Sequence, residues 1–139
     1  MLYQTGDILE VNSYSIIPGI VFTKHYGIYF LIDGIPHITH NSFSTGKIEI
    51  KPFDDFMRGR KVYRILNHVN LTDEEIYNKA LELKSKKGYN FFSYNCEDYI
   101  GEVCKCNMGF DQRIGWLLGL SGAIVFIYIL FKLIFKPAR

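Results

Sequence analysis

Three residues of this 139-residue chain have types and surroundings suited to nucleophilic chemistry, namely Cys96, His25 and His37. Cys96 follows Asn95 and precedes two acidic residues, an order typical of the first turn of a helix. At such a position the backbone N–H groups and the helix dipole favour the thiolate, which is the reactive form of a cysteine. A histidine base and a second polar group that orients it would complete the site. A buried structural cysteine and two structural histidines are the alternative interpretation.

The two histidines lie on a predicted β-hairpin. Residues 25–32 and 35–39 are β-rich, and the Asp-Gly pair between them is a strong signal for a two-residue turn. His25 begins the first run, and His37 lies in the second, twelve positions later. We therefore expect the two imidazole rings near the same end of the hairpin.

The other histidines and cysteines have weaker contexts. His40 is expected to face the opposite side of its strand from His37, as a solvent-exposed polar residue, and His68 is expected in a loop outside the site. No close pair of His or Cys residues has the spacing of zinc ligands, so no metal site is predicted. Cys104 and Cys106 are interpreted as unmodified residues at a helix end, with acylated juxtamembrane thiols as the alternative.

A small antiparallel sheet and two helices are expected to position these groups. The first helix is predicted by a capping box, in which Thr72 caps and Glu75 follows three residues later, and it should run to about residue 86. The second helix should begin near Asn95. Strands are predicted at residues 7–11, 25–32, 35–39, 47–51 and 61–66. This succession predicts an α+β fold.

The composition predicts one ordinary globular domain. Hydrophobic residues make up 48% of the chain, and the 10 Tyr and 11 Phe exclude a disordered or collagen-like protein. The net charge is +2, but four of the 16 basic residues lie after position 112, where there is no acidic residue. The body is therefore slightly acidic, which argues against a nucleic-acid partner. Three cysteines and no signal peptide at the start favour free thiols in a reducing compartment.

The C-terminal part of the sequence predicts a membrane anchor. Residues 114–131 carry no charge and would span about 27 Å as a helix, close to the roughly 30 Å hydrocarbon core of a bilayer. The segment extends to residue 135 if the long basic side chains reach the headgroups. We expect residues 1–112 to form the domain and residues 113–139 to form a single-pass anchor.

The orientation and packing of this anchor are less strongly marked. The free thiols favour a cytosolic domain, and a buried hairpin of a soluble core is the alternative to a membrane helix. Three glycines on roughly one face are a weak signal for self-association through the anchor: Gly115, Gly119 and Gly122.

Four short runs, in their order along the chain, resemble the lecithin retinol acyltransferase-like family. Each run is short, but their combination and the twelve-residue spacing of the histidines are specific, and they cover most of residues 6–106. The runs are Gly6-Asp7-Ile8-Leu9-Glu10, His25-Tyr26-Gly27-Ile28-Tyr29, Asp33-Gly34 followed by His37, and Asn95-Cys96-Glu97.

The resemblance implies a permuted papain-like (NlpC-type) fold and the activity of a small, tail-anchored phospholipase A/acyltransferase. It assigns the nucleophile to Cys96, the general base and acid to His25, and the orientation of the His25 ring to His37. In one respect the chain departs from the family, which often continues Asn-Cys-Glu with His-Phe, where this sequence has Asp98 and Tyr99. This difference bears on the substrate more than on the thiol chemistry.

The reaction implied by these assignments is acyl transfer from a glycerophospholipid of the membrane. Cys96 attacks the acyl ester carbonyl, backbone N–H groups near Cys96 stabilise the oxyanion, and water, an amine or a hydroxyl resolves the thioester. No metal or organic cofactor is needed. Two alternatives stay open: a cysteine peptidase or amidase of the same superfamily, and a non-catalytic membrane-tethered interaction module.

Overall fold

The computed structural model of the protein describes residues 2–12, 24–90, 93–106 and 128. Five antiparallel strands form one sheet in the order β4-β3-β2-β1-β5. The strands are β1 (Asp7–Asn12), β2 (Lys24–Ile32), β3 (Ile35–Ser42), β4 (Lys47–Pro52) and β5 (Val62–His68), and the helices are α1 (Phe53–Met57), α2 (Asp73–Lys86) and α3 (Cys96–Cys104). The α+β class with an antiparallel sheet is confirmed.

The local signals of the sequence account for most of these elements. The turn at Asp33-Gly34 joins β2 to β3, and both residues have positive φ as such a turn requires. The predicted capping box starts α2, where the Thr72 hydroxyl accepts the backbone N–H of Glu75 and the Glu75 carboxylate accepts the backbone N–H of Thr72. The short helix α1 was not predicted, and it begins directly after Pro52.

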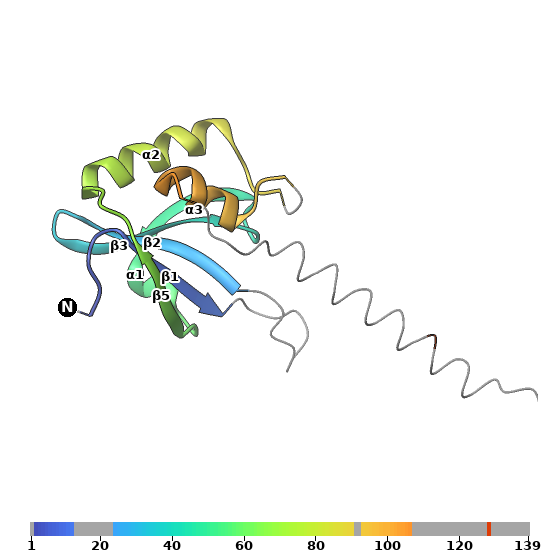
Figure 1. Ribbon diagram of the computed structural model, residues 1–139, viewed down its shortest axis with the longest axis horizontal. Helices are drawn as coiled ribbons and strands as arrows, with labels where there is room; N and C mark the ends of the chain where they lie inside the picture. The colour runs from blue at the N-terminus through green and yellow to red at the C-terminus, as the bar shows by residue number, and fades with distance from the viewer. Residues whose placement is uncertain (1, 13–23, 91–92, 107–127, 129–139) are drawn as a thin grey trace, which may run out of the picture.

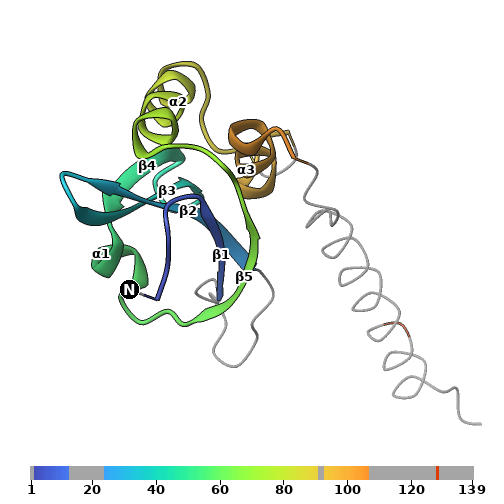
Figure 2. The same ribbon diagram turned by 60° about the vertical axis from the view of Figure 1, so that its left-hand side comes forward.

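The helices cover the two faces of the sheet unequally. Helices α2 and α3 lie over one face and α1 lies over the other, as Figure 1 and the turned view in Figure 2 show. The larger hydrophobic cluster lies beneath α2 and α3 and includes Ile28, Ile76 and Cys96. The smaller cluster lies beneath α1 and is centred on Phe56 and Ile38. We call these the α3-side cluster and the α1-side cluster.

The prediction for the C-terminal part of the chain concerns residues that the structure does not describe. The predicted anchor, residues 114–135, lies outside the described residues except for Tyr128. No helix in the described part of the chain is both long and apolar enough to span a membrane. The division between residues 1–112 and 113–139 and the permuted papain-like arrangement both stay predictions.

Candidate active site

Cys96 is the first residue of α3, as the sequence predicts. The side-chain oxygen of Asn95 accepts the backbone N–H groups of Glu97 at 2.8 Å and of Asp98 at 3.2 Å. In return the Asp98 carboxylate accepts the backbone N–H of Asn95 at 2.9 Å, which completes a capping box. Cys96 is only 2% exposed and lies in the α3-side cluster together with Tyr26 and other apolar residues. Substrate access to its thiol therefore requires movement of the residues around it.

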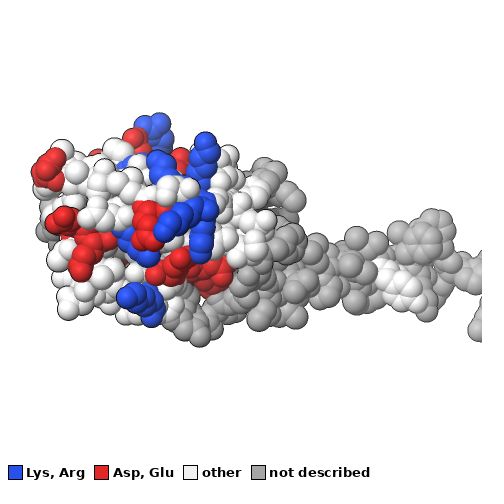
Figure 3. All heavy atoms as spheres, turned by 90° about the horizontal axis from the view of Figure 1, so that it is seen from above, with Lys and Arg blue, Asp and Glu red and all other residues white. Residues whose placement is uncertain are grey.

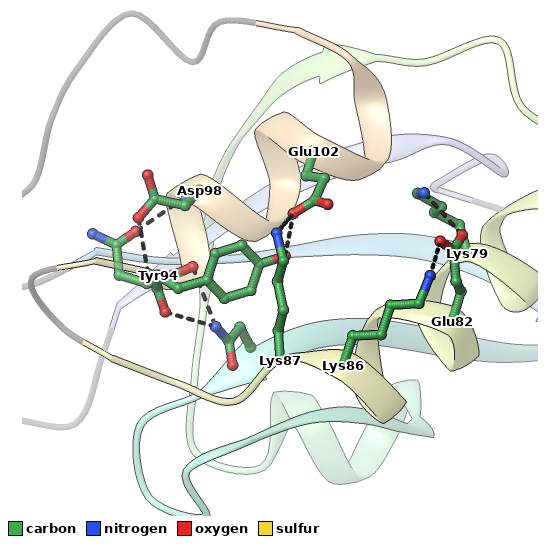
Figure 4. Close-up of polar contacts among 9 residues, drawn as sticks. Lys79, Glu82, Lys86, Lys87, Tyr94, Asp98 and Glu102 are labelled. Atoms are coloured by element: carbon green, nitrogen blue, oxygen red, sulfur yellow. Dashed lines mark hydrogen bonds and ion pairs between the residues drawn. The ribbon is translucent and has the colours of Figure 1, made fainter.

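The segment before Cys96 is held through Tyr94 (Figure 4). The Tyr94 hydroxyl donates to Oε2 of Glu102 at 2.7 Å, and the ammonium of Lys87 donates to the same oxygen at 2.7 Å while lying 4.5 Å from the centre of the Tyr94 ring. Burial, and then the hydrogen bond to the carboxylate, raise the pKa of Tyr94 above its ordinary value, so the hydroxyl stays a donor at neutral pH. The backbone of Tyr94 also pairs with that of Asn90 in both directions.

His25 contacts His40 instead of His37. The Nε2 atom of His25 lies 2.8 Å from Nδ1 of His40, and the two rings meet edge to face with centroids 4.9 Å apart. The ring of Phe56 packs against both imidazoles, at 5.8 Å from His25 and 5.0 Å from His40. His40 is 1% exposed, so the prediction of an exposed residue was wrong. The strand continues past its predicted end to Ser42, and α1 covers the ring.

Both imidazoles of this pair are neutral at pH 7. Burial, and then the neighbouring His40 ring, lower the pKa of His25 well below its ordinary value. Burial, followed by the charges of Lys51 and Arg60, lowers the pKa of His40 to about 3. The Glu49 carboxylate lies 3.3 Å from Nε2 of His40, but the ammonium of Lys51 lies 2.8 Å from the same carboxylate oxygen and offsets its charge.

His37 lies elsewhere on the hairpin, and its predicted contact with His25 is wrong. Its Nδ1 atom lies 2.9 Å from the carbonyl oxygen of Ile35, and in the sheet it pairs with Phe30. The two-residue turn explains the difference, because His37 is near the turn whereas His25 is near the start of β2. At about 3.3 Å per residue, the five positions from His25 to Phe30 correspond to roughly 17 Å along the strand.

The described structure does not bring Cys96 and His25 together. Neighbouring side chains in a strand point to opposite faces of the sheet. Tyr26 belongs to the α3-side cluster with Cys96, whereas the ring of His25 lies against Phe56 in the α1-side cluster. Sequence reasoning missed the partner, His40, whose signal is its place directly opposite Glu49 in the β3–β4 hairpin.

The predicted oxyanion donors, backbone N–H groups near Cys96, stay a prediction, and two of these groups are occupied. The backbone N–H groups of Glu97 and Asp98 both donate to Asn95, so neither points to an incoming carbonyl oxygen in this conformation. A thioester-forming reaction would have to use other donors near Cys96, or to release these from the cap.

The remaining candidates lie away from Cys96 or carry no ligand geometry. His68 is the last residue of β5, not a loop residue, and its Nδ1 atom lies 3.1 Å from the Asp7 carboxylate, beside a surface hollow of about 460 Å³ that Tyr3 and Leu66 also line. Cys104 and Cys106 are partly buried, and neither takes part in a disulfide bond. Among the described residues there is no group of three His, Cys, Asp or Glu side chains that could hold a metal ion.

The charges above this site are mixed. In the view onto the face that carries α2 and α3, basic and acidic side chains alternate (Figure 3). Glu82 holds Lys79 at 2.9 Å and Lys86 at 2.8 Å, and these hydrogen bonds lower the pKa of Glu82 to about 2. The end of α2 therefore presents paired charges to solvent instead of a field of one sign.

Comparison with known proteins gives one result. The family model described as Lecithin retinol acyltransferase matches residues 2–109, which include every described strand and helix up to α3. No curated protein and no solved structure matches the chain.

Proposed function

The chain belongs to the lecithin retinol acyltransferase family, and from this premise we propose that it is a thiol-dependent phospholipase A/acyltransferase with Cys96 as its nucleophile. Membership of an acyltransferase family supports an enzyme that moves acyl groups at that general level. The observation that carries the finer proposal is the position of Cys96 as the first residue of α3, directly after the Asn95 cap. That position favours a thiolate through the helix dipole.

The proposed reaction proceeds through a thioester. The sulfur of Cys96 bonds to the acyl carbonyl carbon of a glycerophospholipid, the ester C–O bond breaks, and the thiol proton passes to the oxygen of the leaving lyso-lipid. Water, or the amine or hydroxyl of a second lipid, then attacks the thioester carbonyl, and its proton returns to the sulfur. Both steps need a group that carries a proton between sulfur and oxygen.

We assign that proton transfer to His25, and the assignment requires a rearrangement. The His25 ring must leave His40 and reach the α3 side of the sheet, because its present contacts are with His40 and Phe56. His25 is the second residue of β2, so the proposed rearrangement falls at the very start of that strand. In this assignment His40 holds the resting His25 ring, a role that the resemblance assigns to His37.

The separation of Cys96 from His25 across the sheet also favours a second candidate function. A chain with a 2% exposed cysteine and with its histidine pair on the other face of the sheet has the arrangement of an interaction module that kept the family's fold without its chemistry. The two candidates differ in whether Cys96 becomes acylated.

The mass of the intact protein after incubation with phosphatidylcholine vesicles tests this difference. We expect an added acyl mass on the wild type, its loss in Cys96→Ser, and its retention in the matched control Cys104→Ser. Fatty-acid release from the same vesicles should follow the same pattern. Cleavage of peptides without any lipid product would favour the peptidase alternative, and the absence of both products would favour the interaction module.

The three histidines of the hairpin can be ranked in the same assay. We expect His25→Ala to abolish turnover and His40→Ala to raise it, because the His25 ring then no longer has to leave His40, whereas His37→Ala should leave turnover almost unchanged because its only described polar contact is a local carbonyl. A loss of turnover in His40→Ala, or a clear change in turnover in His37→Ala, with both variants folded, would contradict this role of His40.

We also propose that residues 114–135 anchor the protein in a membrane with the domain on the cytosolic side. The support is the uncharged run in the sequence, and tethering would raise the local concentration of lipid at the site. The rate on vesicles should fall much further than the rate on a soluble thioester when residues 113–139 are removed. An equal fall in the rate on both substrates would contradict the proposal of an anchor.

A further inference from the structure

We propose that Asn41 is a positioning residue that holds Cys96 in register with the sheet. The proposal rests on the proposed function in taking Cys96 as the nucleophile. Asn41 is the next-to-last residue of β3 and is fully buried. It lies 54 positions before Asn95 in the chain, yet its side chain contacts the backbone on which Cys96 follows.

The contact consists of two hydrogen bonds from one amide group. The Nδ2 atom of Asn41 donates to the carbonyl oxygen of Tyr94 at 3.0 Å and to that of Asn95 at 3.3 Å. The Asn95 carbonyl also accepts the backbone N–H of Tyr99, the first hydrogen bond within α3. Asn41 therefore fixes both the direction from which the chain enters the helix and the first turn that carries Cys96.

Tyr94 secures the other side of the same short segment. Its hydroxyl is bound to Glu102 within α3, its ring packs under Lys87, and its backbone pairs with Asn90 (Figure 4). These contacts tie the segment to the helices, whereas Asn41 ties it to the sheet. Loss of Asn41 should thus leave α3 attached but free to shift relative to β3.

The side-chain oxygen of Asn41 indicates that this residue does not serve stability alone. Its side-chain oxygen is buried and has no hydrogen-bond partner in the described part of the chain. An unsatisfied buried acceptor costs free energy, and an apolar side chain of similar size would avoid that cost. A leucine at this position is therefore compatible with the fold but lacks the donor that holds the two carbonyls.

The test compares Asn41→Leu with the wild type in the full-length protein. We expect a thermal midpoint that is unchanged or higher, together with amide hydrogen exchange at Glu97, Asp98 and Tyr99 that is about tenfold faster because the first turn of α3 is loosened. In lipid turnover, kcat should fall by roughly tenfold to a hundredfold, whereas KM should change by less than about twofold.

Two further variants make the outcome decisive. Asn41→Gln keeps a donor and should recover part of kcat, whereas Asn78→Leu makes the chemically similar change at an exposed position of α2 and should change neither exchange nor turnover. Unchanged exchange at the start of α3 in a folded Asn41→Leu protein, or no difference between Leu and Gln, would overturn the proposal. Absence of acyl transfer in the wild type would refute the proposed function. The hydrogen-exchange measurement does not depend on turnover, so it would still test the role of Asn41.

Discussion

The contact between His25 and His40 joins two neutral imidazoles inside the protein. Phe56 packs against both rings and His40 is almost completely buried, and the nearby cations Lys51 and Arg60 further disfavour a proton on either ring. A base with a strongly lowered pKa takes up a proton poorly at neutral pH. The pair thus stores the His25 ring in an inactive form, and the proposed chemistry needs the ring to leave it.

This pair should make the fold sensitive to mild acid. The pKa of a histidine in the unfolded chain is about 6.5, whereas burial lowers the pKa of His40 to about 3. Between these values the unfolded state binds more protons, so stability falls as the pH decreases, by about 1.4 kcal/mol per pH unit for each such histidine. Urea unfolding at pH 7 and pH 5 should show a smaller loss for His40→Phe than for the wild type, and equal losses would contradict this account.

At the scale of the elements, the two capping boxes have different tasks. The box at Thr72 starts the longer helix α2, whose first turn is mostly exposed, whereas the box at Asn95 starts the short helix that carries Cys96. The Asn95 side chain satisfies two N–H groups in a buried setting, where unsatisfied groups are costly. The second cap therefore matters both for stability and for the orientation of the thiol.

Substitution of both caps should separate these effects. Thr72→Ala and Asn95→Ala should each lower the free energy of unfolding by about 1 to 2 kcal/mol, as measured by urea denaturation. Only Asn95→Ala should change the rate at which iodoacetamide alkylates Cys96. Asn95→Ser, which can still cap, should restore most of both quantities. An equal effect of Thr72→Ala on alkylation would indicate that general loosening, and not the cap, controls the thiol.

The sequence predicts the local structure well, but it predicts poorly which side chains meet across the sheet. The Asp33-Gly34 turn, the Thr72 box and the start of α3 at Cys96 follow from short-range rules. The partner of His25 depends on how far β3 extends and on the packing of α1, and neither has a local signature. Asn41 is recognised only when a segment more than fifty residues later folds back onto it.

At the scale of the molecule, the sheet separates two apolar clusters of unequal size. The α3-side cluster binds together residues from β1, β2, β4, α2 and α3, so it joins the first and last elements of the domain. All described strands and helices of the sheet domain end by Cys104, and the family match ends at residue 109. The end of the domain near residue 112 stays a prediction, which truncation of the chain tests.

A protein cut after residue 112 should consequently fold alone. We expect resistance to protease and one cooperative thermal transition, because the residues of both clusters lie before the cut. Its alkylation rate at Cys96 should equal that of the full-length protein in detergent. An aggregated, protease-sensitive product would show that the C-terminal residues belong to the core.

The hydrogen bonds from Asn41 to Tyr94 and Asn95 also bear on the order in which parts of the chain fold during synthesis. They close a loop of more than fifty residues, whereas the turn between β2 and β3 closes a loop of only two residues. Contacts so far apart in the chain form after local ones, because the entropy of a long loop must first be overcome. A newly made chain should therefore hold a finished β2–β3 hairpin while Cys96 is still open to solvent. During that interval the thiol is exposed to cellular oxidants, from which the folded protein then shelters it at 2% exposure.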